Sequence, residues 1–392
     1  MTYSSPSPFA RPQEGLRVVP GGPTVYLPTQ EEAEFYPRAA ARVLGGIHAS
    51  QEAAGKCGLY NLDWVRGKHF LLAGGTGHGL GGCIAVALLN RLAESGSLTV
   101  VSRDPSRSIT YETGVLMQSR ADESGFGNRF HWINYGLATE GKKFRNIVAA
   151  LGEAGAERVI YINTVAAAHS GTLPGYPPVY VKDVDEKGLF LWQLLPLTEQ
   201  AVQATRWTMG TLSAEFPHEL EKAGIAVEAT AFTDWRGSLD RISRDPGMPE
   251  YGRQGPYSTS LYLPKEIIHD ATAAAYASGK IAMDVYLPVM NTRALSLIPG
   301  GILLLALFER LMRKEAVRRP DVPELALGML DRIGRAIAGG ERNPFPRLDS
   351  HELPFDLWFL EVLTRLNEDE QSEFYYKKWV GNAGAGLTRG VL

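Results

Sequence analysis

The sequence predicts a doubly wound α/β fold, with a mainly parallel sheet and additional helices around it. Apolar segments of strand length alternate with segments of helical length along residues 67–340. This alternation is typical of βαβ units, in which helices cover both faces of a parallel sheet. In addition, the first apolar segment leads through a glycine-rich turn directly into a helix-like stretch. Together, the two observations indicate a Rossmann-like architecture.

The expected elements follow one another in a regular order. We expect strands at residues 69–75, 97–103, 130–135, 158–165, 225–232 and 281–289. We expect helices at residues 81–94, 109–119, 141–154, 198–214 and 264–278, and a further helix after Gly301. The run that contains this last helix is apolar, but Pro299 and Gly300 interrupt it. A membrane span needs about 20 uninterrupted apolar residues, so a buried helix is the better interpretation.

The composition limits the class of protein. With 392 residues, 44% of them hydrophobic and 21% charged, the chain is expected to be soluble and globular. A net charge of −3 offers no basic footprint for nucleic acid. Only two cysteines occur, which excludes a disulfide scaffold, fits a reducing compartment and predicts a cytoplasmic location. The histidines have no metal-ligand spacing to cysteines or carboxylates, so no metal site is expected.

The chain is expected to consist of three parts. Residues 1–66 form an N-terminal extension that begins with a Pro/Ser-rich tail and is partly mobile. Residues 67–340 form the Rossmann-like catalytic domain. Residues 341–392 form a C-terminal helical appendage and tail.

The glycine-rich turn predicts a dinucleotide site, because a pyrophosphate lies against the amides of the following helix in such turns. Gly77, Gly79 and Gly82 satisfy the G-x-G-x-x-G pattern. Gly75, Gly79 and Gly81 satisfy instead the G-x-x-x-G-x-G pattern of short-chain dehydrogenases. A turn that only packs the helix tightly against the sheet is the alternative interpretation. The expected cofactor contacts are Gly75, Thr76, Gly77, His78, Gly79 and Leu80.

The end of the second expected strand favours NADPH over NADH. Enzymes that bind NAD place a carboxylate there, which accepts a hydrogen bond from the ribose. This chain has Ser102 and Arg103 instead, a hydroxyl and a guanidinium that are suited to hold the 2′-phosphate of NADPH. Alternatively, Arg103 is a solvated surface residue and Asp104 binds the ribose.

Three segments are similar to a known family. The loop GTGHGLGGCIA has the family's glycine pattern, and TRALSLIPGGILLLALFERLMRKE has its Thr-x-Ala…Ile-Pro segment with a long apolar helix. Between them, YSTSLYLPKEIIHDATAAAY occupies the position of a Tyr-x8-Lys motif. On these segments the chain resembles the trans-2-enoyl-CoA reductases and the FabV-type enoyl-ACP reductases, which are enlarged short-chain dehydrogenases. The resemblance implies a reductase of α,β-unsaturated acyl thioesters that are carried by CoA or by acyl carrier protein.

The resemblance further implies a catalytic tyrosine and lysine. Hydride addition to C3 leaves an enolate, whose oxygen needs a donor and whose C2 needs a proton. A lysine near the tyrosine favours loss of the phenol proton and holds the cofactor ribose. Tyr257 and Lys265 occupy these positions, with seven intervening residues where the family has eight. The rival pair, Tyr276 and Lys280, has the Tyr-x3-Lys spacing of ordinary short-chain dehydrogenases, and a site without any such pair is the third alternative.

Three more residues are expected near the nicotinamide. Thr164 and Val165 follow the fourth expected strand, at the carboxyl edge of the sheet where ligands bind. Thr292 matches the family's threonine beside the carboxamide. For the neighbouring Asn163 we prefer a capping role, since asparagine is common at turns and helix starts.

Three functions remain open from the sequence. The first is an NADPH-dependent enoyl-thioester reductase, and the second is a ketoreductase that acts on a carrier-bound or polyketide substrate. In the ketoreductase, Tyr276 and Lys280 would face the nicotinamide. The third is a non-catalytic NAD(P)-binding relative, motivated by the altered tyrosine–lysine spacing. For both enzymes the expected partner is a small acyl thioester of fatty acid or polyketide metabolism, and the oligomeric state is not predicted.

Overall fold

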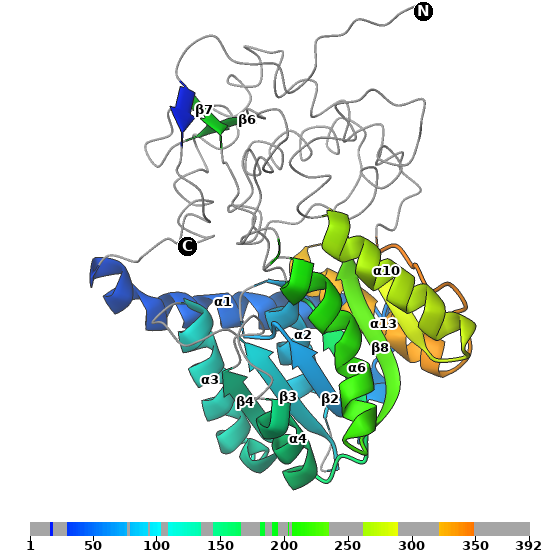
Figure 1. Cartoon of the computed structure of the whole chain (residues 1–392). Helices are drawn as coiled ribbons and strands as arrows, with labels where there is room; N and C mark the ends of the chain where they lie inside the picture. Colours follow the sequence, from blue (N-terminus) through cyan, green and yellow to red (C-terminus); the bar gives the residue numbers. More distant parts are fainter. Residues whose placement is uncertain are drawn as a thin grey trace, which may run out of the picture.

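A six-stranded parallel sheet forms the centre of the protein (Figure 1). The computed structural model describes residues 16–18, 30–76, 79–92, 95–102, 109–134, 144–165, 181–184, 190–194, 203, 206–234, 262–288 and 321–348. The strands are β2 (His69–Ala73), β3 (Ser97–Ser102), β4 (Phe130–Asn134), β5 (Arg158–Asn163), β8 (Ala226–Asp234) and β9 (Ala282–Tyr286). They lie in the order β4-β3-β2-β5-β8-β9, and every neighbouring pair is parallel. The first strand of this sheet, β2, lies in its middle. The chain adds β3 and β4 on one side of β2 and then β5, β8 and β9 on the other, which confirms the predicted doubly wound, Rossmann-like fold.

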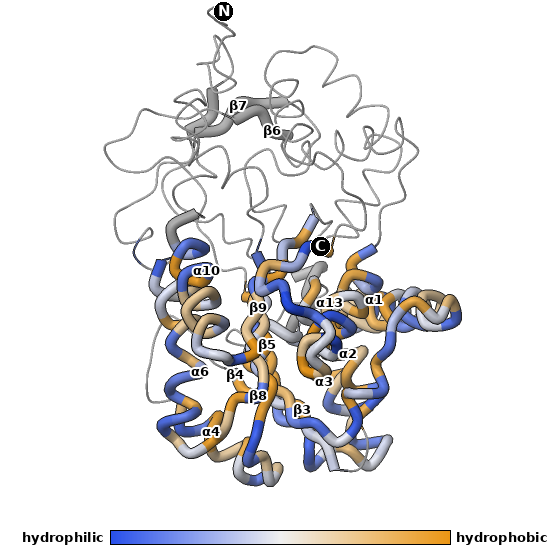
Figure 2. The backbone as a smooth tube through the Cα atoms, turned by 90° about the vertical axis from the view of Figure 1, so that its right-hand side faces the viewer, coloured by the Kyte–Doolittle hydropathy of each residue, from blue (hydrophilic) through white to orange (hydrophobic). Residues whose placement is uncertain are grey.

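Helices cover both faces of this sheet. One face carries α1 (Gln30–Lys56), α2 (Leu80–Leu89), α3 (Ile109–Glu123) and α13 (Val322–Ile337). The other face carries α4 (Phe144–Glu153), α6 (Leu212–Lys222) and α10 (Tyr262–Ala277). Successive strand residues face opposite sides, so Phe70 of β2 packs into the first layer and Leu71 into the second. Because both faces are buried, strands such as β5 and β8 are largely coloured as hydrophobic in Figure 2.

Two helices that the sequence pattern does not predict complete the first layer. α1 packs against α3 and α13, and α13 packs against α2. α13 begins after Asp321, whose carboxylate accepts the backbone N–H of Glu324 at 2.8 Å, and Pro323 lies in its first turn. The helix within the predicted N-terminal extension is therefore packed onto the sheet domain. Neither α1 nor any other described helix is long and apolar enough to cross a membrane.

One expected helix differs from the described structure. Of the helix expected at residues 198–214, the described part from Arg206 to Thr211 is a π-helical turn, which leads into α6, and α6 extends beyond Pro217 to Lys222. The apolar helix expected after Gly301 lies outside the described residues. The other expected helices and strands occur within a few residues of their predicted positions.

A second, three-stranded sheet is not predicted from the sequence. Its strands are β1 (Leu16–Val18), β6 (Val181–Val184) and β7 (Phe190–Leu194), in the order β1-β7-β6. β6 and β7 pair antiparallel, whereas β1 pairs parallel to β7. The sheet thus joins segments that lie far apart in the chain.

The outer edge of β9 is covered by the segment that follows α13. The backbone N–H of Asp284 donates to the Pro344 carbonyl at 2.8 Å, and that of Tyr286 donates to the Pro346 carbonyl at 2.9 Å. The N–H of Leu348 in turn donates to the Tyr286 carbonyl at 3.0 Å. The first residues of the predicted C-terminal appendage therefore extend the sheet. They satisfy backbone groups that an edge strand would otherwise leave unpaired.

Candidate cofactor site and active site

The glycine-rich turn follows β2, between β3 and β5, where the direction of winding changes. Gly74 has a φ of 89°, a left-handed value that glycine adopts without strain. A Cβ atom on Gly75 would lie 2.7 Å from Leu72 Cδ2 and 2.9 Å from Val100 Cγ1. These two glycines therefore let the backbone turn tightly and press against the sheet.

The next two glycines that the structure describes, Gly79 and Gly81, have different roles. A Cβ atom on Gly81, in the first turn of α2, would overlap the Gly74 carbonyl oxygen and Thr164 Oγ1, so this glycine allows close contact between helix and sheet. A Cβ atom on Gly79 would meet nothing within 4 Å among the described residues. Gly79 is the N-cap of α2, and no described side chain caps this helix. It leaves space in front of the first amides of α2, and the amides of a helix start are where an anion such as a pyrophosphate binds.

The remaining residues of the predicted loop flank this space or lie beyond the described part. The Thr76 side chain is fully buried, and its hydroxyl has no hydrogen-bond partner among the described residues. Leu80 is buried as the first residue of α2. Gly77 and His78 lie outside the described residues. A buried hydroxyl beside an uncapped helix start fits a site in which a ligand supplies the missing hydrogen-bond partners.

Thr164 ties the end of β5 to the glycine-rich turn. Its hydroxyl donates to the Ala73 carbonyl at 3.0 Å, and its backbone N–H donates to the same oxygen at 2.9 Å. Asn163 caps the strand, because its side-chain oxygen accepts the Val165 N–H at 2.9 Å and its amide donates to the Tyr161 hydroxyl at 2.9 Å. Burial raises the pKa of the Tyr161 phenol, and the hydrogen bond from Asn163 opposes this shift. Thr164 and Val165 thus lie at the carboxyl edge, while their contact with a cofactor stays a prediction.

Ser102 ends β3, on the side of the sheet where the ribose is expected. Its side chain is nearly buried, and its hydroxyl accepts a hydrogen bond from Trp132 Nε1 of β4 at 2.6 Å. Gly114 lets α3 approach this indole, since a Cβ atom there would lie 2.7 Å from Trp132 Cζ2. Arg103 lies outside the described residues. Ser102 therefore holds Trp132 in place, and the preference for NADPH stays a prediction that depends on Arg103.

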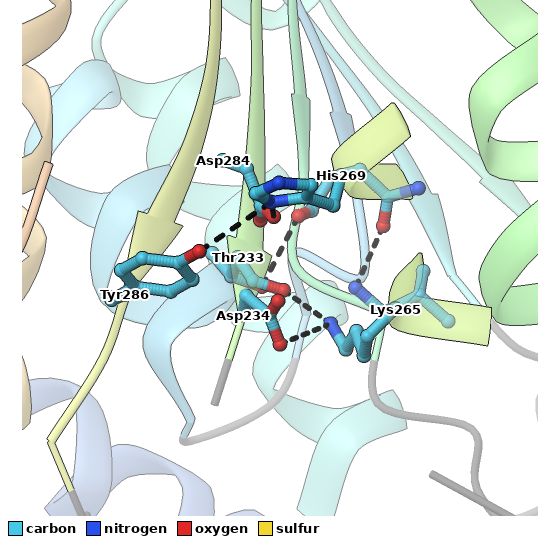
Figure 3. A network of polar contacts seen from close by, with 8 residues as sticks. Thr233, Asp234, Lys265, His269, Asp284 and Tyr286 are labelled. Atoms are coloured by element: carbon cyan, nitrogen blue, oxygen red, sulfur yellow. Dashed lines mark hydrogen bonds and ion pairs between the residues drawn. The ribbon is translucent and has the colours of Figure 1, made fainter. Parts of the chain in front are cut away.

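Lys265 lies near the start of α10 and points toward the carboxyl end of β8 (Figure 3). Its ammonium donates to the Thr233 carbonyl and lies 4.0 Å from Asp234 Oδ1. The Asp234 side chain is completely buried, and that of Lys265 is 16% exposed. Gly210 of the π-helical turn allows close packing here, because a Cβ atom on it would lie 3.0 Å from Pro264 Cα. Lys265 is therefore at the same edge of the sheet as the glycine-rich turn.

Tyr276 and Lys280 lie at the opposite edge of the sheet. α10 runs back from the carboxyl edge, so its last turn is close to the start of β9. The Tyr276 hydroxyl donates to the Arg342 carbonyl at 2.6 Å, and Lys280 forms an ion pair with Glu221 at 2.7 Å. The two side chains have separate partners, and their helical spacing does not bring them to the glycine-rich turn.

Beside Lys265, three further polar residues that the sequence pattern does not predict gather between α10 and β9 (Figure 3). His269 follows Lys265 by one helical turn, and its Nδ1 lies 4.0 Å from Asp284 Oδ2 and 3.5 Å from the Tyr286 hydroxyl. Phe345, from the segment along β9, stacks on the imidazole with ring centroids 4.0 Å apart. The sequence does carry one signal for this group. Asp284 and Tyr286 are alternate residues of an apolar strand, so they share one face of the sheet.

Comparison with solved structures identifies the fold. The chain is similar to a trans-2-enoyl-CoA reductase of Clostridium acetobutylicum in complex with NADH, with a TM-score of 0.63, 14% identity and 90% of each chain covered. The chain has the fold of trans-2-enoyl-CoA reductase. The same enzyme in complex with NAD gives a TM-score of 0.59 and 14% identity, with 88% of this chain and 91% of that chain covered. No protein-family model and no curated protein matches the sequence.

The resemblance to the enoyl-thioester reductases is thereby confirmed for the fold. Within this trans-2-enoyl-CoA reductase fold, the carboxyl edge combines an uncapped helix start, the ammonium of Lys265 and an imidazole beside a carboxylate. Such groups can bind phosphates, orient ribose hydroxyls and hold a proton. No three His, Cys, Asp or Glu side chains in the described part of the chain are arranged to hold a metal ion. Tyr257 and Thr292 lie outside it.

Proposed function

We propose that this protein is an NADPH-dependent reductase of an α,β-unsaturated acyl thioester carried by CoA or by acyl carrier protein. The observation that carries the proposal is the position of Lys265. Its ammonium lies at the carboxyl edge of the sheet, in a fold shared with a trans-2-enoyl-CoA reductase. Fatty acid or polyketide metabolism would use this reaction, and the free Cys57 and Cys83 fit a cytoplasmic enzyme.

The described residues fit a nicotinamide dinucleotide. The open space at Gly79, the uncapped start of α2 and the Thr76 hydroxyl provide donors and room for a pyrophosphate. Thr164 packs against Gly74 and Gly81 of the turn from the end of β5. When bound, the cofactor supplies the hydride that is transferred to C3 of the substrate.

Tyr257 and Lys265 act together on the substrate oxygen in this proposal. Hydride addition to C3 develops negative charge on the thioester oxygen, and the Tyr257 hydroxyl donates a hydrogen bond to it. The positive charge of Lys265 makes that phenol more acidic and so strengthens its hydrogen bond to the oxygen. The Thr233 carbonyl and the Asp234 carboxylate orient the ammonium, so its position is set before substrate binds.

The placement of Tyr276 supports enoyl reduction over keto reduction. The ketoreductase hypothesis requires Tyr276 and Lys280 to face the nicotinamide. The Tyr276 hydroxyl instead donates to the Arg342 carbonyl, at the end of α10 that is remote from the glycine-rich turn. Lys265, by contrast, lies at the correct edge for the Tyr-x8-Lys motif of the enoyl reductases.

The test is NADPH oxidation with crotonyl-CoA and, separately, with acetoacetyl-CoA. We expect loss of NADPH absorbance with crotonyl-CoA alone. Oxidation with acetoacetyl-CoA alone would contradict the proposal and favour the ketoreductase. Oxidation with neither compound, nor with the corresponding acyl-carrier-protein thioesters, would favour the non-catalytic relative.

A further inference from the structure

Tyr286, His269 and Asp284 form a continuous polar group between α10 and β9 (Figure 3). The Tyr286 hydroxyl lies 3.5 Å from His269 Nδ1, and the same nitrogen lies 4.0 Å from Asp284 Oδ2. Phe345 stacks on the imidazole with an angle of 19° between the two planes, which fixes the orientation of the ring. A phenol and a carboxylate thus converge on one imidazole nitrogen. Such separations commonly shorten when substrate binds.

The carboxylate of this group lies in an apolar interface. Asp284 is completely buried, and its cross-strand neighbour on β8 is Phe232. The adjacent Met283 and Val285 pack on the opposite face of the sheet. A buried carboxylate is favourable only with a partner for its charge, and His269, when its imidazole is protonated, provides a cation 4.0 Å away. The pair is therefore suited to hold a proton on the imidazole.

The phenol of Tyr286 belongs to the same edge of the sheet as Lys265. Tyr286 is in register with Asp234 of β8, whose carboxylate lies 4.0 Å from the Lys265 ammonium. Lys265 also precedes His269 by one turn of α10. On the other side of Tyr286, the backbone of the exposed Arg347 forms an isolated β-bridge with it, from the segment along β9. Of the charged residues on these elements, Asp284 lies 4.0 Å from the imidazole, Asp234 lies beside Lys265, and Arg347 is in the backbone segment along β9.

The proposed reaction needs a proton that the oxyanion donor does not supply. Once hydride has added to C3, the Tyr257 hydroxyl stabilises the thioester oxygen in our proposal. C2 is a different atom and must gain its own proton before the saturated thioester is complete. A second acidic group at the same edge of the sheet meets this need.

We infer that Tyr286, His269 and Asp284 relay this proton to C2 of the enolate, an inference that rests on the proposed function. The O–H bond of Tyr286 breaks as the C2–H bond forms. The phenolate oxygen then takes the Nδ1 proton of the His269 imidazolium, and the neutral imidazole regains a proton from water. Asp284 stays ionised throughout and stabilises the imidazolium. One hydride and one proton are added across the C2–C3 bond, and the protein returns to its starting charge.

The test compares the pH dependence of turnover in the full-length protein and in three variants. With NADPH and crotonyl-CoA, we expect Tyr286→Phe to lower kcat about 100-fold, with an unchanged KM and an unchanged Kd for NADPH. Wild-type kcat is expected to fall once the pH is high enough to deprotonate the His269 imidazolium. Asp284→Asn moves this fall to lower pH, because the carboxylate favours the charged ring. His269→Gln removes the fall from the profile.

The control is Tyr60→Phe. Tyr60 lies in the segment before β2, and its hydroxyl donates a hydrogen bond to Glu324 of α13 at 3.2 Å. This variant is expected to keep the wild-type kcat. A wild-type kcat in Tyr286→Phe would overturn the relay and leave the proposed function intact. Absence of turnover by the wild-type protein with every enoyl thioester would overturn both. If Asp284→Asn does not fold, an NMR titration of His269 replaces it. Removal of the Tyr286 hydroxyl is expected to shift the imidazole titration curve, and an unchanged curve would overturn the relay.

Discussion

Replacing Gly79 by alanine tests the cofactor site without disturbing the fold. The Gly79 backbone has φ −84° and ψ −167°, an extended conformation that any residue adopts. An added Cβ atom would meet no described atom within 4 Å. The change at the helix N-cap is expected to lower the free energy of unfolding by less than about 1 kcal/mol. If a pyrophosphate lies against the start of α2, however, the same methyl group occupies its space.

The effect on cofactor binding is expected to be much larger than the effect on stability. One extra methyl group in a filled interface typically costs about 1–3 kcal/mol. At 1.4 kcal/mol per factor of ten, the Kd for NADPH in Gly79→Ala is expected to rise by about tenfold or more. Titration of NADPH fluorescence measures this Kd, and urea denaturation measures the free energy of unfolding.

Gly81→Ala is the matched control, two residues further along the same helix start. Its Cβ atom would overlap the Gly74 carbonyl oxygen and Thr164 Oγ1, so it is expected to lower the free energy of unfolding by about 1–3 kcal/mol. An unchanged Kd for NADPH in Gly79→Ala would refute the placement of the pyrophosphate at α2. A loss of stability in Gly79→Ala as large as that in Gly81→Ala would refute the geometry of the turn.

Three further predictions concern the 2′-phosphate, the catalytic pair and a buried histidine. Arg103→Ala is expected to erase a preference for NADPH of about tenfold, or about 1.4 kcal/mol, without changing the Kd for NADH; an unaltered ratio of the two Kd values would place the 2′-phosphate elsewhere. Tyr257→Phe is expected to lower kcat by about 10² to 10³ with the NADPH affinity retained, whereas Lys265→Ala impairs both and Tyr276→Phe neither. A silent Tyr257→Phe with an inactive Tyr276→Phe would favour the ketoreductase. Burial lowers the pKa of His131, so the unfolded chain takes up this proton first as the pH falls. The free energy of unfolding is therefore expected to decrease as the pH falls below about 6.5, and to decrease less steeply in His131→Gln. Equal slopes of this free energy against pH in the two proteins would contradict a lowered pKa of His131.

The parts of the site that depend on local sequence could be predicted. The strand before Gly75 and the helix after Gly79 are contiguous with the turn, so pattern and order sufficed to place them. The position of Lys265 at the carboxyl edge of the sheet follows from a similar rule, because a helix that leads into a parallel strand begins at that edge. The same rule argues against Tyr276, since the end of such a helix lies at the amino edge whatever its spacing to Lys280.

The remaining parts of the site depend on contacts between residues that are far apart in the chain. Asp284 and His269 approach each other only through the register of β9 and the rotation of α10 about its axis. Phe345 reaches the imidazole from beyond α13, a helix that the pattern of alternating elements did not include. Likewise, the crowded surroundings of Gly81 depend on Thr164. None of these distances can be obtained from spacing along the sequence.

The segment that pairs with β9 makes residues beyond 340 part of the sheet domain. A chain shortened at residue 340 would keep the six strands and their described helices, but the N–H groups of Asp284 and Tyr286 would lose their acceptors. An open edge of this kind is a template for pairing with another molecule. The shortened protein would therefore self-associate along β9, and the imidazole of His269 would lose the ring that covers it. Residues 344–348 thus protect the edge of β9 from pairing with other molecules, a role that their position after the last described helix does not reveal.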